Sequence, residues 1–196
     1  IPRPETEILV QEALSAAESL KKAGPIRILD IGTGSGNIAI ALAKFLTSVE
    51  IHAGDISCAC ISLARTNARA VSVSKKIVFH QSDLLRCFKK HPVAFDIIVS
   101  NPPYVTQEEY NDLAEDVRQE PRLALVAEDN GFYFYRRIEQ EARYYLKSQG
   151  QLFLEIGDEQ AREVKNIFKD SSVWKDIRVV RDLCGRDRVI VVTKKG

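Results

Sequence analysis

The sequence predicts an α/β fold: a mostly parallel sheet, doubly wound by helices, that finishes with an antiparallel pair of strands. Short apolar, β-branched runs alternate with helical patterns along most of the chain, as in parallel strands joined by helical crossovers. The last two runs, Trp174 to Arg181 and Arg188 to Thr193, have no helical pattern between them. We therefore expect a hairpin there, and a hairpin joins antiparallel strands.

The composition indicates one compact domain, residues 1–196, because 45% of the residues are hydrophobic and 28% are charged. The formal net charge is +1 and the basic residues are scattered, which argues against direct binding of nucleic acid. No apolar run is long enough to cross a membrane, and the amino end lacks the apolar core of a signal peptide. We expect a cytoplasmic protein without a membrane partner.

The four cysteines show neither a disulfide framework nor metal-ligand spacing, and the three histidines are dispersed along the chain. We interpret the cysteines as buried or half-buried thiols and expect no metal. The chain contains no methionine and opens on Ile1, so we expect a fragment that lacks a preceding domain.

Apolar periodicity predicts the remaining elements in chain order. In the first half, Gly24-Pro25 ends the first helix and Ser57 caps the third. The expected ranges there are helix 5–23, strand 26–31, helix 37–46, strand 50–55, a helix through 59–68 and strand 77–82. In the second half we expect a surface segment at 84–94, strand 95–100, an acidic excursion or lid at 108–120, helix 131–146, strand 150–157 and helix 158–168.

A glycine loop, Gly32-Thr33-Gly34-Ser35-Gly36, follows the first strand directly and opens a helix. Glycines let the backbone turn tightly beside a ligand, and the carboxylate of Asp55, 23 positions after Gly32, is placed to accept ribose hydroxyls. Asn37 stands where a dinucleotide fingerprint needs a third glycine, and no P-loop lysine follows. The spacing is typical of a loop beside an amino acid joined to a nucleoside.

The motif Asn101-Pro102-Pro103-Tyr104 ends the fourth predicted strand. Two prolines stop the sheet ladder and stiffen the loop, so the Asn101 side-chain oxygen and the Pro102 carbonyl can act as fixed acceptors for a substrate –NH2 group. Such acceptors orient a nitrogen whose lone pair is delocalised and need no strong general base. Tyr104 can cover a planar substrate group. The alternative is a plain turn with Tyr104 packed against its neighbours.

These motifs resemble those of the class I methyltransferases, which use S-adenosylmethionine and release S-adenosylhomocysteine. The resemblance implies a Rossmann-like, seven-stranded sheet with a reversed last strand. It also implies that the glycine loop passes beneath the methionine portion, that Asp55 binds the ribose, and that Asp83 accepts from the adenine amine with Leu84 against the ring. The alternative role of each carboxylate is to end a strand or cap a helix.

Further motifs are similar to those of the protein-(glutamine-N5) methyltransferases. They are Ile1-Pro2-Arg3-Pro4-Glu5-Thr6-Glu7, Glu120-Pro121-Arg122-Leu123-Ala124-Leu125, Glu155-Ile156-Gly157 with Gln160, and Gly185-Arg186-Asp187-Arg188-Val189. This resemblance implies methylation of the glutamine in the Gly-Gly-Gln motif of peptide chain release factors. It also implies an amino-terminal helical domain that grips the release factor, which we expect to be missing from this chain.

Two other functions stay open. The Asn-Pro-Pro-Tyr loop also occurs in adenine-specific methyltransferases of DNA and rRNA, although these need a flipped base and a basic surface, and the near-neutral charge disfavours that reading. A module that binds the cofactor without turning it over is the third hypothesis.

Overall fold

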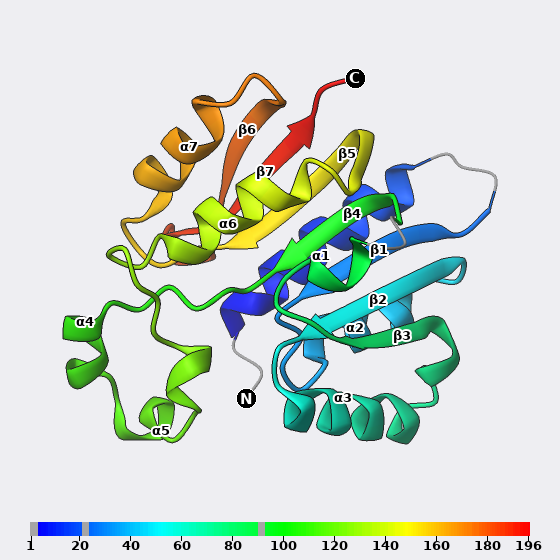
Figure 1. The fold of residues 1–196 in the computed structure, drawn as a ribbon, viewed down its shortest axis with the longest axis horizontal. Coiled ribbons are helices and arrows are strands. Elements are labelled where there is room, and N and C mark those ends of the chain that lie inside the picture. The colour runs from blue at the N-terminus through cyan, green and yellow to red at the C-terminus, as the bar shows by residue number, and fades with distance from the viewer. Residues whose placement is uncertain (1–3, 21–23, 90–92) are drawn as a thin grey trace.

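The computed structural model describes residues 4–20, 24–89 and 93–196, whose strands form one seven-stranded sheet with helices on both faces (Figure 1). The strands are β1 (Ile26–Ile31), β2 (Val49–Asp55), β3 (Ile77–Gln81), β4 (Phe95–Ser100), β5 (Leu146–Glu155), β6 (Trp174–Arg181) and β7 (Asp187–Lys194). Their order across the sheet is β3-β2-β1-β4-β5-β7-β6. Strands β1 to β5 pair in parallel, whereas β7 is antiparallel to both β5 and β6. The predicted mostly parallel sheet with an antiparallel last strand is confirmed.

Seven α-helices lie in the described residues, four of them in crossovers that the sequence predicts. The helices are α1 (Pro4–Ser19), α2 (Asn37–Phe45), α3 (Cys58–Ala70), α4 (Gln107–Asp112), α5 (Glu115–Arg118), α6 (Tyr133–Ala142) and α7 (Ala161–Lys169). Short 3-10 turns lie at Ser74–Lys76, Arg86–Phe88 and Arg122–Ala124. As predicted, Ser57 caps α3, its hydroxyl accepting the Cys60 amide at 3.3 Å.

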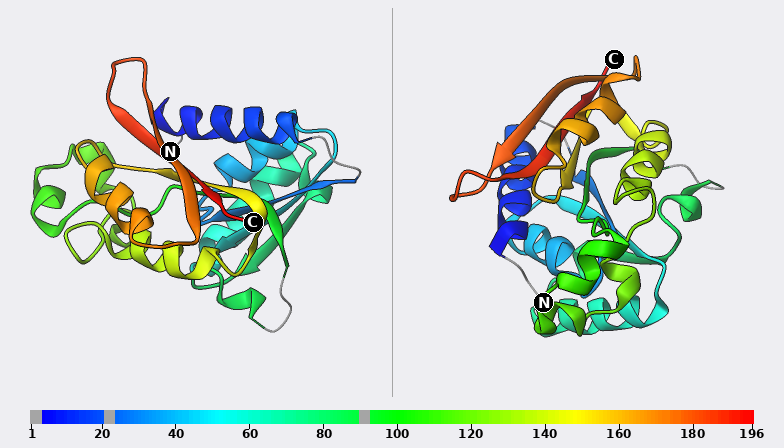
Figure 2. Two further views of the ribbon diagram at one scale, coloured as in Figure 1. Left: turned by 90° about the horizontal axis from the view of Figure 1, so that it is seen from above. Right: turned by 90° about the vertical axis from the view of Figure 1, so that its left-hand side faces the viewer.

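The strands alternate side chains between two apolar cores, one on each face of the sheet. In β1, Ile28 packs with α1, α2 and α3, whereas its neighbour Leu29 packs with α6 and α7. Figure 2 shows α1 on one side of the sheet and α6 and α7 on the other. Burial on both faces explains why the central strands are almost continuously apolar in sequence.

Four expected ranges need correction. The helix expected at 131–146 is α6, Tyr133–Ala142, because strand β5 already begins at Leu146. Within the described residues, helix α1 ends at Ser19, and Leu20, which follows it, is 38% exposed; residues 21–23 of the expected helix lie outside the described part. Strand β5 begins at Leu146, four residues early, because extra residues on β5 between Leu146 and Gln151 shift the register and let Leu146 pair with Phe95 of β4. The segment expected at the surface after β3 instead buries Leu85 and Phe88.

The acidic excursion forms its own small lobe, which carries α4 and α5 and lies apart from the sheet in Figure 1. Its base is closed by Val105, whose amide donates to Leu125 at 2.9 Å and whose carbonyl accepts from Ala127 at 2.9 Å. The α4 amino end carries a capping box between Thr106 and Glu109. Its action as a lid stays a prediction. Within the described residues, no helix is both long and apolar enough to span a membrane.

Candidate active site

The candidate site lies where the parallel strands end, because parallel strands place their carboxyl ends at one edge of a sheet. The glycine loop follows β1, Asp55 ends β2, Asn101 follows β4 and Glu155 ends β5. The Ser100 hydroxyl donates to the Ile31 carbonyl at 2.8 Å, which ties the exit of β4 to the exit of β1. The topology therefore brings together the glycine loop and the Asn-Pro-Pro-Tyr motif, two motifs that stand far apart in sequence.

The glycine loop turns tightly, with φ values of +70° at Gly32, +56° at Gly34 and +89° at Gly36. A side chain at Gly34 would meet nothing within 4 Å, so backbone conformation rather than space requires glycine there. The Gly34 amide donates to Asp55 Oδ2 at 2.9 Å. The Ser35 carbonyl accepts from Asn67 on α3 at 2.9 Å. The loop is held from both β2 and α3.

Asp30, which the sequence analysis did not single out, is the most unusual ionisable group of the site. It is fully buried, and its Oδ2 accepts from the Thr33 hydroxyl at 2.6 Å and the Ala39 amide at 3.2 Å. Its Oδ1 is buried and has no hydrogen-bond partner among the described residues. Burial, partly offset by these two bonds, raises the pKa of Asp30 to about 6. The sequence feature that could have identified Asp30 is its position: it is an acidic residue in an otherwise mostly apolar strand, just before the glycine loop.

Both predicted nucleoside-binding acids have protein partners. Asp55 accepts from Gly34 through Oδ2 and from the Ser57 amide through Oδ1 at 2.8 Å. Asp83 accepts from both terminal nitrogens of Arg137, at 2.8 and 3.2 Å. These bonds raise the pKa of Arg137 against the opposing effect of burial. The sequence analysis missed Arg137, because it lies on α6, far along the chain.

Leu84 follows Asp83 in a left-handed conformation, with φ +46°, and packs against the core beside α6. Three strand spacings separate β3 from β4, about 14 Å at ~4.8 Å each. Asp83 and Leu84 therefore lie toward one end of the site edge and Asn101 toward the other. Their contacts with an adenine ring stay predictions.

Asn101 is half-buried and its Nδ2 donates to Thr6 Oγ1 of α1 at 3.2 Å. The Thr6 hydroxyl donates in turn to Glu155 Oε2 at 2.7 Å, and Glu155 is buried. The predicted motif around Thr6 thus contacts the Asn-Pro-Pro-Tyr motif directly. Residues 1–3 of that amino-terminal motif lie outside the described part.

Tyr104 is held at the other end of the motif. Its carbonyl accepts from Gln160 Nε2 at 3.1 Å, and Gln160 Oε1 accepts from the Gly157 amide at 3.0 Å. Gly131 adopts φ +85°, and a Cβ there would lie 2.4 Å from the Tyr104 carbonyl oxygen. Only glycine allows this close approach, so the loop rests against a bare backbone. Pro102 is buried and Pro103 half-buried between the two anchors.

Comparison with known proteins agrees with this geometry. Residues 6–176 match the family model described as "Methyltransferase small domain". The chain is 42% identical over 193 residues to the release factor glutamine methyltransferase of Streptococcus pneumoniae, covering 98% of this chain and 66% of that protein. It is also 42% identical over 193 residues to the protein of that name from Lactococcus lactis, again covering 98% of this chain and 68% of the relative.

The chain belongs to the release factor glutamine methyltransferase family. It spans about two thirds of the length of the curated relatives it matches, and slightly less than that of the first. Among solved structures, the ribosomal protein L11 methylase of Lactobacillus delbrueckii has a TM-score of 0.69 at 21% identity, covering 100% of this chain and 81% of that one. That likeness confirms the class I methyltransferase fold alone.

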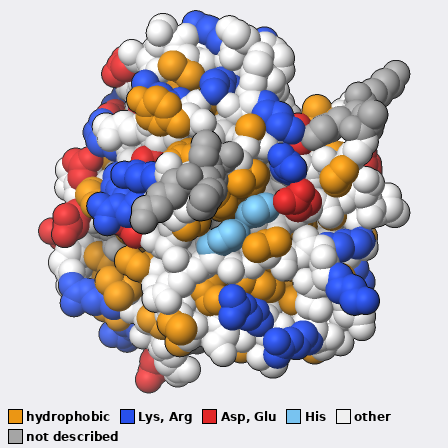
Figure 3. Space-filling model, turned by 45° about the vertical axis from the view of Figure 1, so that its right-hand side comes forward, with side chains coloured by type: hydrophobic (Ala, Val, Ile, Leu, Met, Phe, Trp, Pro, Cys, Tyr) orange, Lys and Arg blue, Asp and Glu red, His pale blue; other side chains and the backbone are white. Residues whose placement is uncertain are grey.

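Folding brings two histidines together, and one expectation, about the cysteines, needs correction. His52 and His80 are far apart in sequence, but pairing of β2 with β3 brings His52 Nδ1 within 2.9 Å of His80 Nε2. Figure 3 shows the histidines side by side at the surface. Burial lowers the pKa of His80, with smaller contributions from His52 and Arg65. The cysteines were expected to be buried or half-buried, which is wrong for three of them: Cys60 is half-buried, but Cys58 at the start of α3, Cys87 in a 3-10 turn and Cys184 in the β6–β7 turn are exposed.

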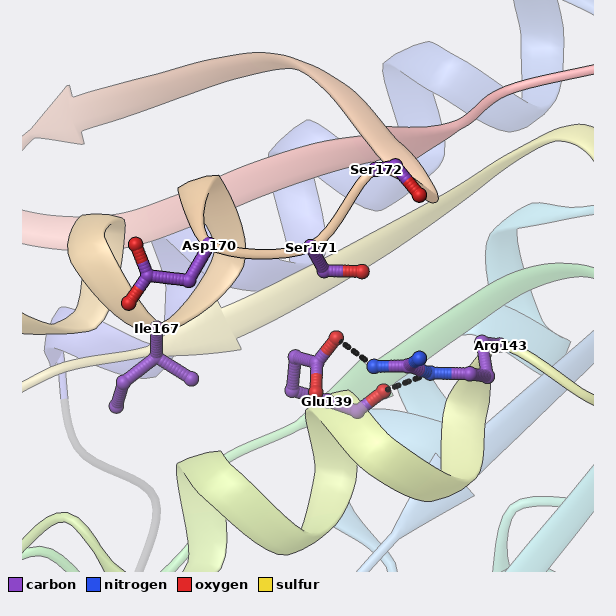
Figure 4. A pocket seen from close by; sticks show the side chains of 6 residues that line it. All are labelled: Glu139, Arg143, Ile167, Asp170, Ser171 and Ser172. Atoms are coloured by element: carbon purple, nitrogen blue, oxygen red, sulfur yellow. Dashed lines mark hydrogen bonds and ion pairs between the residues drawn. The ribbon is translucent and has the colours of Figure 1, made fainter.

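No cluster of three or more metal-binding side chains was found within the described residues. A polar hollow of about 340 Å³ lies between α6 and the α7–β6 turn, lined by residues that Figure 4 labels, including Glu139, Arg143 and Ser171. Arg143 pairs with Glu139, which also accepts from Trp174 Nε1 at 2.8 Å. The hollow lies at the carboxyl end of α7, away from the edge that holds Asn101.

Proposed function

We propose that this enzyme transfers a methyl group from S-adenosylmethionine to the side-chain amide nitrogen of the glutamine in the Gly-Gly-Gln motif of a peptide chain release factor. The observation that carries the proposal is that Asn101 lies at the same sheet edge as the glycine loop and the buried Asp30. The names of relatives 42% identical to this chain support the choice of substrate.

The residues beside the glycine loop fit the methionine portion of the cofactor. Asp30 Oδ1 is a buried acceptor without a partner among the described residues, and an ammonium group is the ligand that such a carboxylate lacks. Gly32, Thr33, Gly34, Ser35 and Gly36 then line the chain of the amino acid. Because the Thr33 hydroxyl donates to Asp30, we assign it to support of that carboxylate.

We assign the nucleoside to the three positions that the sequence analysis predicts. Asp55 would accept from the ribose hydroxyls while it keeps its bonds to Gly34 and Ser57, since each carboxylate oxygen has two acceptor sites. Asp83 and Leu84 would contact the adenine. The Arg137 pair holds the Asp83 carboxylate in place for that role.

The Asn101 Oδ1 and the Pro102 carbonyl hold the substrate amide, because each accepts a hydrogen bond from one of its two N–H groups. S-adenosylmethionine, when bound, would supply the methyl group: the nitrogen lone pair would form the N–C bond, the electrons of the broken S–C bond would stay on sulfur, and the surplus proton of the nitrogen would pass to water. The two acceptors orient the nitrogen and stabilise the positive charge that develops on it. In this proposal Pro103 stiffens the loop, and the Tyr104 ring covers the planar amide group of the substrate.

We further propose that residues 1–196 act as one catalytic domain and that the release factor is its protein partner. A substrate that works on the ribosome would put the reaction in the cytoplasm. If the relatives bind the release factor through the part of their length that this chain does not span, residues 1–196 alone will bind cofactor well and the release factor weakly.

The experiment incubates the chain with methyl-labelled cofactor and a purified release factor, followed by mass spectrometry of the tryptic peptides. We expect one methyl group on the glutamine of the Gly-Gly-Gln motif, and none on a release factor with that glutamine changed to alanine. Equal labelling of both release factors would overturn the proposal. DNA and rRNA serve as parallel substrates, and their methylation in place of the release factor would establish the adenine-specific alternative.

A further inference from the structure

Three side chains from distant parts of the chain form one line of hydrogen bonds that ends at the proposed reaction site. Asn101 Nδ2 donates to Thr6 Oγ1 at 3.2 Å, and Thr6 Oγ1 donates to Glu155 Oε2 at 2.7 Å. Thr6 lies in the first turn of α1, Asn101 follows β4, and Glu155 is the last residue of β5. We call this line the Thr6–Glu155 relay.

The direction of the relay follows from the chemistry of its members. The hydroxyl of Thr6 carries a single proton, and it donates that proton to Glu155 Oε2. The Thr6 oxygen is then an acceptor, and the group of Asn101 that faces it must be the donor, –NH2. The Asn101 carbonyl oxygen therefore points to the other side of the amide plane.

The backbone of the loop is anchored on both sides of Asn101, but these anchors do not fix the orientation of the Asn101 side-chain amide. Ser100 is tied to Ile31, and the Tyr104 carbonyl is tied to Gln160, so the backbone on both sides of Asn101 is anchored. Without the Thr6 hydroxyl, nothing described here prevents the amide of Asn101 from turning over. A turned amide would present –NH2 to the substrate nitrogen, and two donors facing each other cannot bond.

We propose that Thr6 and Glu155 are positioning residues that hold the Asn101 carboxamide with its oxygen toward the substrate. The inference rests on the proposed function and deepens it, since only a substrate with an –NH2 group requires an acceptor at Asn101. It also gives a physical reason for a threonine in the amino-terminal motif. Thr6 and Glu155 act on the rate of methyl transfer through Asn101, and themselves contact neither cofactor nor substrate.

The test compares Thr6→Val, which removes the hydroxyl at nearly constant volume, with Thr6→Ser, which retains it. We expect Thr6→Val to lower kcat on the release factor about tenfold, with KM and the cofactor Kd within about twofold of the parent chain, the scale of one lost hydrogen bond. Thr6→Ser should restore most of kcat. Thr66→Val on α3, whose hydroxyl donates to the Ser62 carbonyl at 3.1 Å, is the matched control and should keep full kcat.

Melting temperatures accompany each rate, and Thr6→Ala serves as a second hydroxyl-free variant if valine lowers the melting temperature. Unchanged kcat in both hydroxyl-free variants, a loss confined to KM, or a loss that serine does not restore would overturn the inference. Failure of the proposed function looks different, because the parent chain itself would then leave the release factor unmethylated.

Discussion

The glycine loop and the Asn101 loop lie at one edge of the sheet, but they are held in opposite ways. The bonds that shape the glycine loop join Asp30 to residues 3 and 9 positions away, Gly34 to a residue 21 positions away and Ser35 to one 32 positions away. Those that hold the Asn101 loop join residues 95 and 56 positions apart, and the relay behind it spans 149. The first loop is a local structure and the second is a tertiary one.

This difference has a functional consequence. The glycine loop can form once β1, α2, β2 and α3, which are consecutive in the chain, have packed together, because its supports belong to that unit. The Asn101 loop is complete only when α1 and the end of β5 have docked against β4. Changes around the Asn101 loop should therefore alter turnover while cofactor binding persists, and changes around the glycine loop should do the reverse.

The strongest test removes the acceptor itself. Asn101→Ala should lower kcat about 100-fold or more, the scale seen when one preorganised group that stabilises developing charge is lost. The cofactor Kd should stay within about twofold, because the glycine loop has its own supports. Initial rates with the release factor and calorimetric titration of the cofactor measure the two quantities.

Asn166→Ala, an exposed position on α7, is the control for this change and should behave as the parent chain. Loss of cofactor binding together with a lowered melting temperature in Asn101→Ala would show that Asn101 is structural and that the two loops are not separable.

The reverse effect is expected at Asp30. Asp30→Asn should weaken cofactor binding about 10- to 100-fold, since a charge-assisted hydrogen bond to the ammonium group is worth ~1.5–3 kcal/mol. Cofactor affinity of the parent chain should fall as pH drops below about 6, where Asp30 takes up a proton, and the variant should lack this step. Titrations at pH 5 and pH 8 measure both effects.

The same substitution should stabilise the cofactor-free protein. The pKa of Asp30 is raised from 3.8 to about 6, so ionisation costs folding free energy: nothing below pH 4 and up to about 3 kcal/mol above pH 6. Stability of the parent chain thus falls between pH 4 and pH 6, and Asp30→Asn removes that fall. Asp176→Asn, at a 70% exposed side chain, is the control. Equal stability of Asp30→Asn and its parent at pH 8 would contradict the assignment.

A smaller effect is expected where the Asn101 loop rests on bare backbone. In Gly131→Ala, the new Cβ would overlap the Tyr104 carbonyl at 2.4 Å in addition to straining φ, and we expect a loss of about 2–4 kcal/mol in unfolding free energy. Gly185→Ala shares the positive φ, +81°, but meets nothing within 4 Å, and should lose about 1 kcal/mol.

Chemical denaturation of the two alanine variants isolates the contribution of the overlap. Turnover should fall only in Gly131→Ala, because only that change displaces Tyr104. Matching losses in the two variants would mean that backbone strain alone matters and that the loop tolerates the contact.

The smallest effect is expected at Gln160. Gln160→Ala removes the bonds to the Tyr104 carbonyl and the Gly157 amide, and should cost about 1–2 kcal/mol with a few-fold loss of kcat. Gln81→Ala removes one exposed bond to the Ile56 carbonyl, at 3.4 Å, and should cost almost nothing. Chemical denaturation and rate measurements on both variants test this prediction. If Gln160→Ala keeps the kcat of its parent, Gln160 contributes to stability alone and not to turnover.

Residue order alone predicts most of the fold. The alternation of β-branched runs with helical patterns predicts all seven strands, and the missing helix between the last two predicts the reversed β7. These features are local, since they depend on side-chain periodicity and on turns of a few residues. Burial could not be predicted as well: Leu20 is more exposed, and Leu85 and Phe88 more buried, than their local patterns suggested.

The site shows the same division. The glycine loop and the Asn-Pro-Pro-Tyr motif can be identified from the sequence, because glycine permits backbone conformations that other residues avoid and proline fixes its own φ. The unpartnered Asp30 oxygen, the Arg137 pair on Asp83 and the Thr6–Glu155 relay are visible only after folding. Each depends on which side chains share a buried volume, and the packing of distant elements decides that. The sequence motifs thus identify the candidate reacting groups, whereas the tertiary structure determines the ionisation and the orientation of their side chains.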